Sequence, residues 1–341
     1  MLVEVFINKF FMKKLFILAL AALCAFVGCN KENSSDGHSK GGVVRFSTHL
    51  NDYAVKSSLA ENEQIGVFAG APISRLNVLG TVNSSKGVDF ASGSEILWQA
   101  GQTEATTFAA YHPYNANCDA EPADPFKFTF SVPSDQSSAA NYAAADLLTA
   151  LAANVAVPAD PATADPITLT FGHQGVKFVV TITKNNSSEV ENVEILDTNL
   201  SGTVDLETLT VVSLTTPGTI LAFRPDPSAD AFEAIILPAE DIAPKIRITV
   251  TGGTTYTYSL NAPMTFAAGK QYTASIDITS QQISSNHASF VVGDITDWEV
   301  VSDPLSYDSD SLPDDSDPEV DSPGAPQGRV PDMEHGWDLD F

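Results

Sequence analysis

The stretch FKFTFSV, residues 126–132, alternates apolar and polar side chains at every position. The same alternation recurs over residues 176–182, 245–250 and 272–278. Because successive side chains of a strand point to opposite faces of its sheet, a period of two predicts a strand with one buried face. Turn residues such as Asn185-Asn186 and Gly252-Gly253 separate these runs. The pattern therefore predicts an all-β fold of mostly antiparallel sandwiches.

One segment, residues 138–157, is rich in alanine and does not alternate strictly. It could form a short helix or a long connection. The following stretch contains Pro161 and Pro166, and a residue before a proline avoids the helical conformation. We place a domain boundary there, which gives one sandwich over residues 43–163 and a second over residues 164–301. The length of 341 residues also suggests about two domains.

Charge and composition exclude several classes of protein. The chain has 43 acidic and 17 basic residues, for a net charge of −26. A nucleic-acid-binding protein needs a basic footprint, and a polybasic membrane-surface protein needs clustered lysine and arginine, so neither class fits. Apolar residues make up 43% of the chain and charged residues 18%, so it is not disordered throughout.

The amino-terminal residues predict export. Lys13-Lys14 precedes an uncharged apolar run over residues 15–27, which has the length of a signal-peptide core and is short for a membrane span. We expect Met12 to be the true start and residues 1–28 to contain the signal peptide. The residues Phe26-Val27-Gly28-Cys29 resemble the lipobox of bacterial lipoproteins, and this resemblance implies that Cys29 is lipidated. The alternative is an ordinary secretory signal in which Cys29 is incidental.

Polar segments flank the body of the chain. Residues 29–42 are expected to form a tether, and Lys31-Glu32 in it resembles the surface-export signal of lipoproteins in gut and oral bacteria, with a plain solvated linker as the alternative. Residues 302–341 hold 12 acidic residues, six prolines and one arginine. Such a composition predicts a largely disordered acidic tail.

Several short motifs, taken in order, resemble the fimbrillin-like proteins, which are lipoprotein subunits of type V pili. The resemblance implies two tandem transthyretin-like sandwiches, no enzymatic activity and a role in pilus assembly or adhesion. It rests on QIGVF at 64–68, Trp98, TFAAYHPY at 107–114, DLL at 146–148, LTFGH at 169–173, Leu237-Pro238, FAAGKQY at 266–272 and ITDW at 295–298. Four aromatic residues of these motifs are predicted to lie in the core or at a domain seam: Trp98, Tyr111, Tyr114 and Trp298.

The resemblance also implies a mode of assembly. In this family a first strand covers a groove, a protease removes that strand after an arginine, and a strand of the next subunit replaces it, which is β-augmentation. The candidate first strand here is residues 43–50, and its buried face is predicted to carry Val44, Phe46 and Thr48. Lys56 lies nearest to the expected processing position, whereas Arg45 lies inside the strand.

Motifs for catalysis and metal binding are absent from the sequence. It contains no H-E-x-x-H, no G-x-x-x-x-G-K-[ST], no G-x-G-x-x-G and no G-x-S-x-G. Cys118 is most simply a lone loop cysteine, because a nucleophile would need a positioned base. Asp308 to Asp317 faintly resembles a calcium loop but lacks the turn glycine and closing glutamate. We therefore expect no catalytic residue, no cofactor and no metal.

The function expected from all these features is that of a surface-exposed lipoprotein of the outer membrane. It would be a structural or accessory subunit of type V pili, at the anchor or tip, with a role in adhesion. Its expected partners are other pilus subunits, through strand complementation, the outer membrane, through the lipid on Cys29, and a ligand on a host or bacterial surface. The alternative is a surface lipoprotein that binds glycans or host proteins and does not polymerise.

Overall fold

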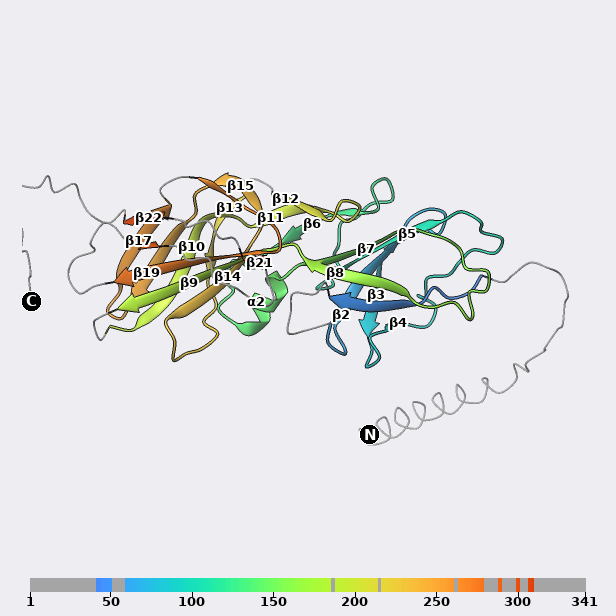
Figure 1. The fold of residues 1–341 in the computed structure, drawn as a ribbon, viewed down its shortest axis with the longest axis horizontal. Coiled ribbons are helices and arrows are strands. Elements are labelled where there is room, and N and C mark those ends of the chain that lie inside the picture. The colour runs from blue at the N-terminus through green and yellow to red at the C-terminus, as the bar shows by residue number, and fades with distance from the viewer. Residues whose placement is uncertain are drawn as a thin grey trace, which may run out of the picture. The chain divides into compact units, whose positions relative to one another are not determined.

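The computed structural model describes residues 41–50, 59–184, 188–213, 216–260, 263–278, 288–289, 299–300 and 306–309. Within these residues nearly all regular structure is strand, and the one helix is α2, Ala139–Ala145 (Figure 1). The expectation of an all-β fold is confirmed. Cys29, Lys56, Trp298 and the calcium-like segment up to Asp317, apart from the strand that ends at Ser309, lie outside the described residues.

The first half of the chain builds a seven-stranded sheet. All neighbouring strands in it are antiparallel except β1 and β8, which are parallel. In spatial order the strands are β1 (Phe46–Leu50), β8 (Ile167–His173), β7 (Leu148–Val155), β5 (Thr106–His112), β2 (Gln64–Ala69), β3 (Arg75–Val82) and β4 (Val88–Phe90).

The second half of the chain builds a ten-stranded sheet and all but one strand of two small sheets. The parallel pair β9–β19 lies inside the large sheet. The path of the large sheet is β13 (Pro217–Leu221), β10 (Val190–Asn199), β16 (Lys245–Val250), β17 (Thr254–Leu260), β22 (Ser306–Ser309), β20 (Ala288–Ser289), β19 (Lys270–Ile278), β9 (Val176–Lys184) and β14 (Ala231–Ile236), with β21 (Glu299–Val300) beside β19. The small sheets are β12 (Thr210–Ser213), β11 (Ser201–Asp205) and β6 (Lys127–Ser131), and the pair β15 (Ala239–Ile242) and β18 (Met264–Phe266).

Strand pairing crosses the expected boundary at residue 163 in both directions. β6 precedes the boundary and pairs with β11, whereas β8 follows it and pairs with β1 and β7. Likewise, β22 falls within residues 302–341, where the sequence predicts a largely disordered tail, and it pairs with β17 and β20. The division into two transthyretin-like sandwiches stays a prediction.

Two hydrophobic cores hold these sheets together. The first core contains Phe46, Trp98, Phe108 and Phe171. The second core extends from Tyr111 on β5 to the strands of the large sheet. The two cores share the strands β2 and β5, because each of these strands buries side chains on both of its faces. In β2, for example, Val67 belongs to the first core and Phe68 to the second.

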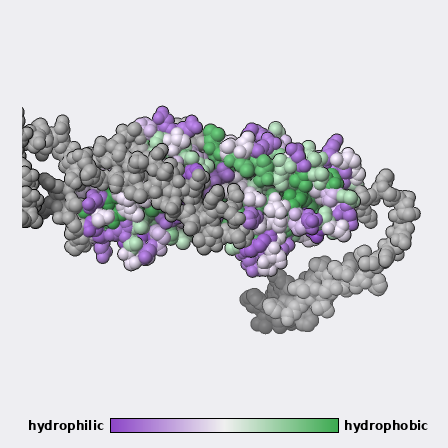
Figure 2. All heavy atoms as spheres, in the orientation of Figure 1, coloured by the Kyte–Doolittle hydropathy of each residue, from purple (hydrophilic) through white to green (hydrophobic). Residues whose placement is uncertain are grey.

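The alanine-rich segment divides into a helix and a strand. Ser138 caps α2, because its hydroxyl accepts a hydrogen bond from the Asn141 N–H over 3.2 Å. The second part of the segment forms β7, between β5 and β8. Ala150 is fully buried there, and Ala152 packs against the first core. On the face shown in Figure 2, apolar side chains gather over the region of β5 and β7.

Candidate functional site

The candidate site is β1 together with the backbone groups that hold it, and we call this the β1 site. β1 lies at one end of the seven-stranded sheet and pairs in parallel with β8, from Phe46 opposite Ile167 to Leu50 opposite Phe171. The Ile167 N–H extends this pairing by donating to the Arg45 carbonyl over 2.8 Å. One edge of β1 is therefore paired along its whole length.

The buried face of the strand is the one that the alternation predicts. Val44, Phe46 and Thr48 are 1%, 2% and 5% exposed. The Phe46 ring meets the Phe108 ring edge-on at 5.3 Å between centroids and the Phe90 ring at 6.0 Å. These contacts fasten the strand to the first core, since burying one such side chain contributes roughly 1.5–3 kcal/mol.

The opposite face carries polar side chains. Arg45 is exposed and its guanidinium donates to the Ala164 carbonyl. The hydroxyls of Ser47 and Thr168 lie 3.3 Å apart. This face contributes hydrogen bonds and little apolar burial, so most of the stabilisation comes from the face that carries Phe46.

Backbone bonds also hold the second edge of β1. The Val44 N–H donates to the Ile96 carbonyl over 2.8 Å, and the Thr48 N–H donates to the Lys86 carbonyl over 2.8 Å. Isolated bridges join Val43 to Leu97 and Ser47 to Gly87. Departure of β1 would leave all these partners unpaired, and an unpaired buried backbone group is costly.

The turn between β3 and β4 is built to present the Lys86 carbonyl. The side-chain oxygen of Asn83 accepts bonds from the N–H groups of Ser85, at 3.0 Å, and Gly87, at 2.9 Å. Lys86 has a positive φ of 64°, and its ammonium donates to the Leu59 carbonyl over 3.0 Å. The turn thereby contacts both β1 and Leu59, the first described residue after the gap at 51–58.

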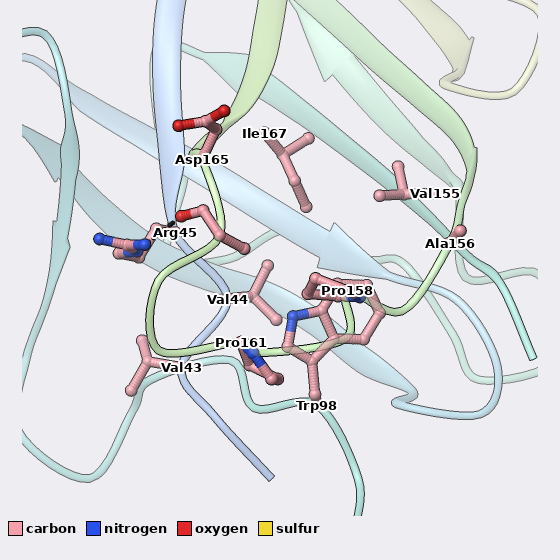
Figure 3. A pocket seen from close by; sticks show the side chains of 11 residues that line it. Val43, Val44, Arg45, Trp98, Val155, Ala156, Pro158, Pro161, Asp165 and Ile167 are labelled. Carbon is pink, nitrogen blue, oxygen red and sulfur yellow. Dashed lines mark hydrogen bonds between the residues drawn. The ribbon is translucent and has the colours of Figure 1, made fainter. Parts of the chain in front are cut away.

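A small cavity of about 80 Å³ lies at the start of the strand (Figure 3). Val44, Trp98, Pro158, Pro161 and Ile167 are among the residues that line it. Trp98 is 4% exposed and meets the Phe108 ring edge-on at 5.6 Å. The cavity is much smaller than the roughly 300–1,000 Å³ of small-molecule sites, so its walls serve to pack the strand.

Two more of the predicted aromatic residues, Tyr111 and Tyr114, lie outside the β1 site. Tyr111 is fully buried, and its hydroxyl lies 3.0 Å from Asn77 Oδ1 and 3.1 Å from the Asn115 carbonyl oxygen. The same hydroxyl accepts a bond from the Asn115 N–H over 3.0 Å. Burial raises the pKa of Tyr111 well above its ordinary value. Tyr114 is half-buried.

A close approach explains the glycine in the QIGVF motif. Gly66 on β2 pairs with Tyr111 on β5, and a Cβ at position 66 would lie 2.2 Å from Cε1 of that ring. The motif residues Gly66 and Tyr111 therefore form one packing unit, which joins β2 and β5 to the second core.

Two contacts of the β1 site could not be inferred from the sequence. These are the bonds from Thr48 to Lys86 and from Arg45 to Ala164, which span 38 and 119 residues. The composition of residues 83–87, Asn-Ser-Ser-Lys-Gly, predicts a turn. It does not predict which strand that turn contacts. In the described part of the chain no group of three or more histidine, cysteine or acidic side chains could hold a metal ion.

A family model described as fimbrillin-like matches residues 53–298. The chain belongs to the fimbrillin-like family. Proteins of this family are structural subunits of fimbriae and not enzymes, and they assemble with other pilus subunits at the cell surface. No curated protein matches the chain. None of the described helices is long and apolar enough to span a membrane.

Solved structures share the fold of this fimbrillin-like chain. A candidate cell adhesion protein from Bacteroides ovatus superposes with a TM-score of 0.58 at 16% identity, covering 77% of this chain and 100% of the other. A candidate cell adhesion protein from Bacteroides uniformis gives 0.52 at 22% identity, covering 70% and 93%. A fimbrial protein from Bacteroides vulgatus gives 0.50 at 13% identity, covering 77% and 99%.

Proposed function

We propose that the unprocessed form of this fimbrial subunit is held at the outer membrane by a lipid on Cys29, and that the processed subunit assembles by strand complementation. In this proposal residues 43–50 occupy the edge of β8 until cleavage near Lys56 releases them. A strand of another subunit then takes their place. The proposal applies alike to a stalk, an anchor or a tip subunit, and adhesion to a host or bacterial surface is part of it.

The supporting observation is the position of β1 at the end of its sheet. β1 is a short strand at an edge, its apolar side chains point inward at alternate positions, and the segment that contains Lys56 follows it directly. A strand placed in this way can leave without breaking the order of the other six strands. The vacated edge of β8 would then accept a strand with apolar residues at the same alternate positions.

The alternative of a glycan-binding lipoprotein requires exposed aromatic rings, which could stack on sugars. Trp98 and Tyr111 are buried. Among the described residues the exposed large apolar side chains are Val43, Leu79, Leu97 and Val212, and none of them is aromatic. These observations favour the assembly proposal over the alternative.

Two measurements on the same cells test the proposal. Amino-terminal sequencing of the surface protein should give a start after Lys56 in polymerised material. Native extracts should contain ladders that resist SDS and dissociate on heating. Surface protein that begins at Cys29 and runs only as a monomer would favour the non-polymerising lipoprotein.

A peptide experiment tests the strand itself. Deleting residues 43–50 from the full chain should open the edge of β8, so the truncated protein should bind a peptide of the sequence VVRFSTHL or self-associate. The matched control peptide carries Phe46→Asp, which places a charge where the first core requires an aromatic ring. Equal binding of the two peptides, or no binding of either by a folded monomer, would exclude exchange at this site.

A further inference from the structure

The ten-stranded sheet also has two ends, β13 and β14, and the backbone groups of β14 need partners on both sides. β9 pairs with one side of β14. Because backbone groups in an antiparallel strand alternate in direction, Glu233 and Ile235 present theirs to the side away from β9. Unpaired groups at this edge would be a template for the addition of a foreign strand.

On the edge of β14 that faces away from β9, one residue bonds to a backbone and the next outward-facing residue bonds to a side chain. Glu233 exchanges two hydrogen bonds with Phe223, at 2.7 and 2.8 Å. At Ile235 the partner is the side chain of Gln136: its Nε2 donates to the Ile235 carbonyl over 2.8 Å, and its Oε1 accepts from the Ile235 N–H over 2.8 Å. One carboxamide therefore supplies both bonds that a neighbouring strand would otherwise make.

The backbone of Gln136 binds the other end of the same sheet. Its N–H donates to the Leu221 carbonyl over 2.9 Å, and the Leu221 N–H donates to the Ser134 carbonyl over 2.8 Å. Leu221 is the last residue of β13. Gln136 is fully buried, and it connects the two ends of the sheet.

We infer that Gln136 determines where this protein accepts a strand, by closing the β14 edge against strands of other copies. A buried carboxamide suits this task because it places a donor and an acceptor side by side, as a peptide group does, and because it adds no strand that could pair further. A fimbrial subunit that pairs through strands must confine pairing to one place. The inference rests on the proposed assembly through strands, but it concerns β14 alone and does not require that β1 is the strand exchanged.

The test compares two buried glutamines in the full-length chain. Gln136→Leu removes both bonds to Ile235 and keeps a side chain of similar length. The matched control is Gln271→Leu: Gln271 is 5% exposed, lies inside the sheet on β19 and donates to the Thr273 hydroxyl of its own strand over 3.1 Å. Any association through β1 is common to both variants.

Light scattering after size exclusion should show that Gln136→Leu self-associates as its concentration rises, while the control behaves as wild type. Hydrogen exchange of the Ile235 amide should accelerate roughly tenfold in Gln136→Leu only, the change that loss of one hydrogen bond produces. A Gln136→Leu variant that stays monomeric with wild-type exchange would overturn the inference, as would equal association of both variants. The wild type supplies a measurement that needs no variant to fold: its Ile235 amide must be protected as strongly as the Ala234 amide, and free exchange there would refute the closure of this edge.

Discussion

The backbone N–H of Thr48 donates a hydrogen bond to the carbonyl oxygen of Lys86 over 2.8 Å. Thr48 belongs to β1, and Lys86 lies in the turn before β4, so this bond joins the two ends of the seven-stranded sheet. β1 is consequently bound on both edges, by β8 on one side and by the turn on the other. The edge strand of this sheet is therefore protected.

The anchor prediction concerns Cys29. Replacing Cys29 by alanine should abolish labelling of the protein with a palmitate analogue in growing cells, because the lipobox-like sequence predicts that this cysteine carries the lipid. Cys118→Ala is the matched control and should label as wild type. Labelling of Cys29→Ala at the wild-type level would rule out the lipoprotein assignment.

A pair of substitutions in β1 tests the two faces of the strand. Phe46→Asp should lower the free energy of unfolding of the unprocessed chain by at least about 3 kcal/mol, since it removes a buried ring and desolvates an unpaired charge. Ser47→Asp, one residue further on the polar face, should cost about 1 kcal/mol at most. Urea denaturation measures both. Equal losses would mean that the strand does not bury the face that carries Phe46.

The Phe46→Asp variant also reports on processing. If residues 43–50 leave, a processed subunit lacks position 46, and its unfolding midpoint should equal that of the wild type. A lasting difference in midpoint after processing would show that the strand remains attached.

The Tyr111 hydroxyl offers a test of the second core. Tyr111→Phe keeps the ring but removes the hydroxyl that accepts from the Asn115 N–H and lies 3.0 Å from Asn77 Oδ1, so the free energy of unfolding should fall by about 0.5–1.5 kcal/mol. Tyr114→Phe is the matched control in the same motif. Its loss should be smaller, because Tyr114 is only half-buried whereas Tyr111 is fully buried. A loss for Tyr114→Phe as large as that for Tyr111→Phe would contradict this assignment.

Cys118 gives a prediction about pH. Burial raises the pKa of its thiol above the ordinary value. The thiolate is the reactive form, so alkylation of Cys118 by iodoacetamide should be slower in the native protein than in urea-unfolded chain near pH 8. The native rate should continue to rise at pH values where the unfolded rate has levelled off. Peptide mass spectrometry measures both, and coincident pH profiles would contradict the prediction.

The alternation of apolar and polar residues predicted the strands that bury only one face. The runs at 126–132, 176–182, 245–250 and 272–278 match β6, β9, β16 and β19 to within two residues at each end, and these predictions are confirmed. In contrast, β2 and β5 serve two cores at once, so Val67 and Phe68 are adjacent in sequence and both fully buried. No period of two exists there. The motif resemblance identified these segments where the pattern could not.

The strand β7 shows a different limit. Its alanines favour a helix by themselves, and the preceding residues do form α2. Leu148–Val155 is a strand because β5 and β8 supply hydrogen-bonding partners on both sides, and small side chains such as Ala150 fit against the first core. Tertiary pairing therefore outweighs the local preference.

The sequence by itself determined the all-β class, the strands with one buried face, the inward side of β1 and the resemblance to fimbrillin-like proteins. Each of these depends on neighbouring residues or on short motifs in a recognisable order. Only the tertiary structure decided which strand edges are hydrogen-bonded and by which residues. The Lys86 carbonyl pairs with Thr48 on β1, and the Gln136 side chain pairs with Ile235 on β14, 99 residues away. The physical reason is that the backbone groups of an edge strand can bond to any backbone or amide group that the fold brings within about 3 Å. The residues next to the strand in sequence do not indicate which distant group that will be.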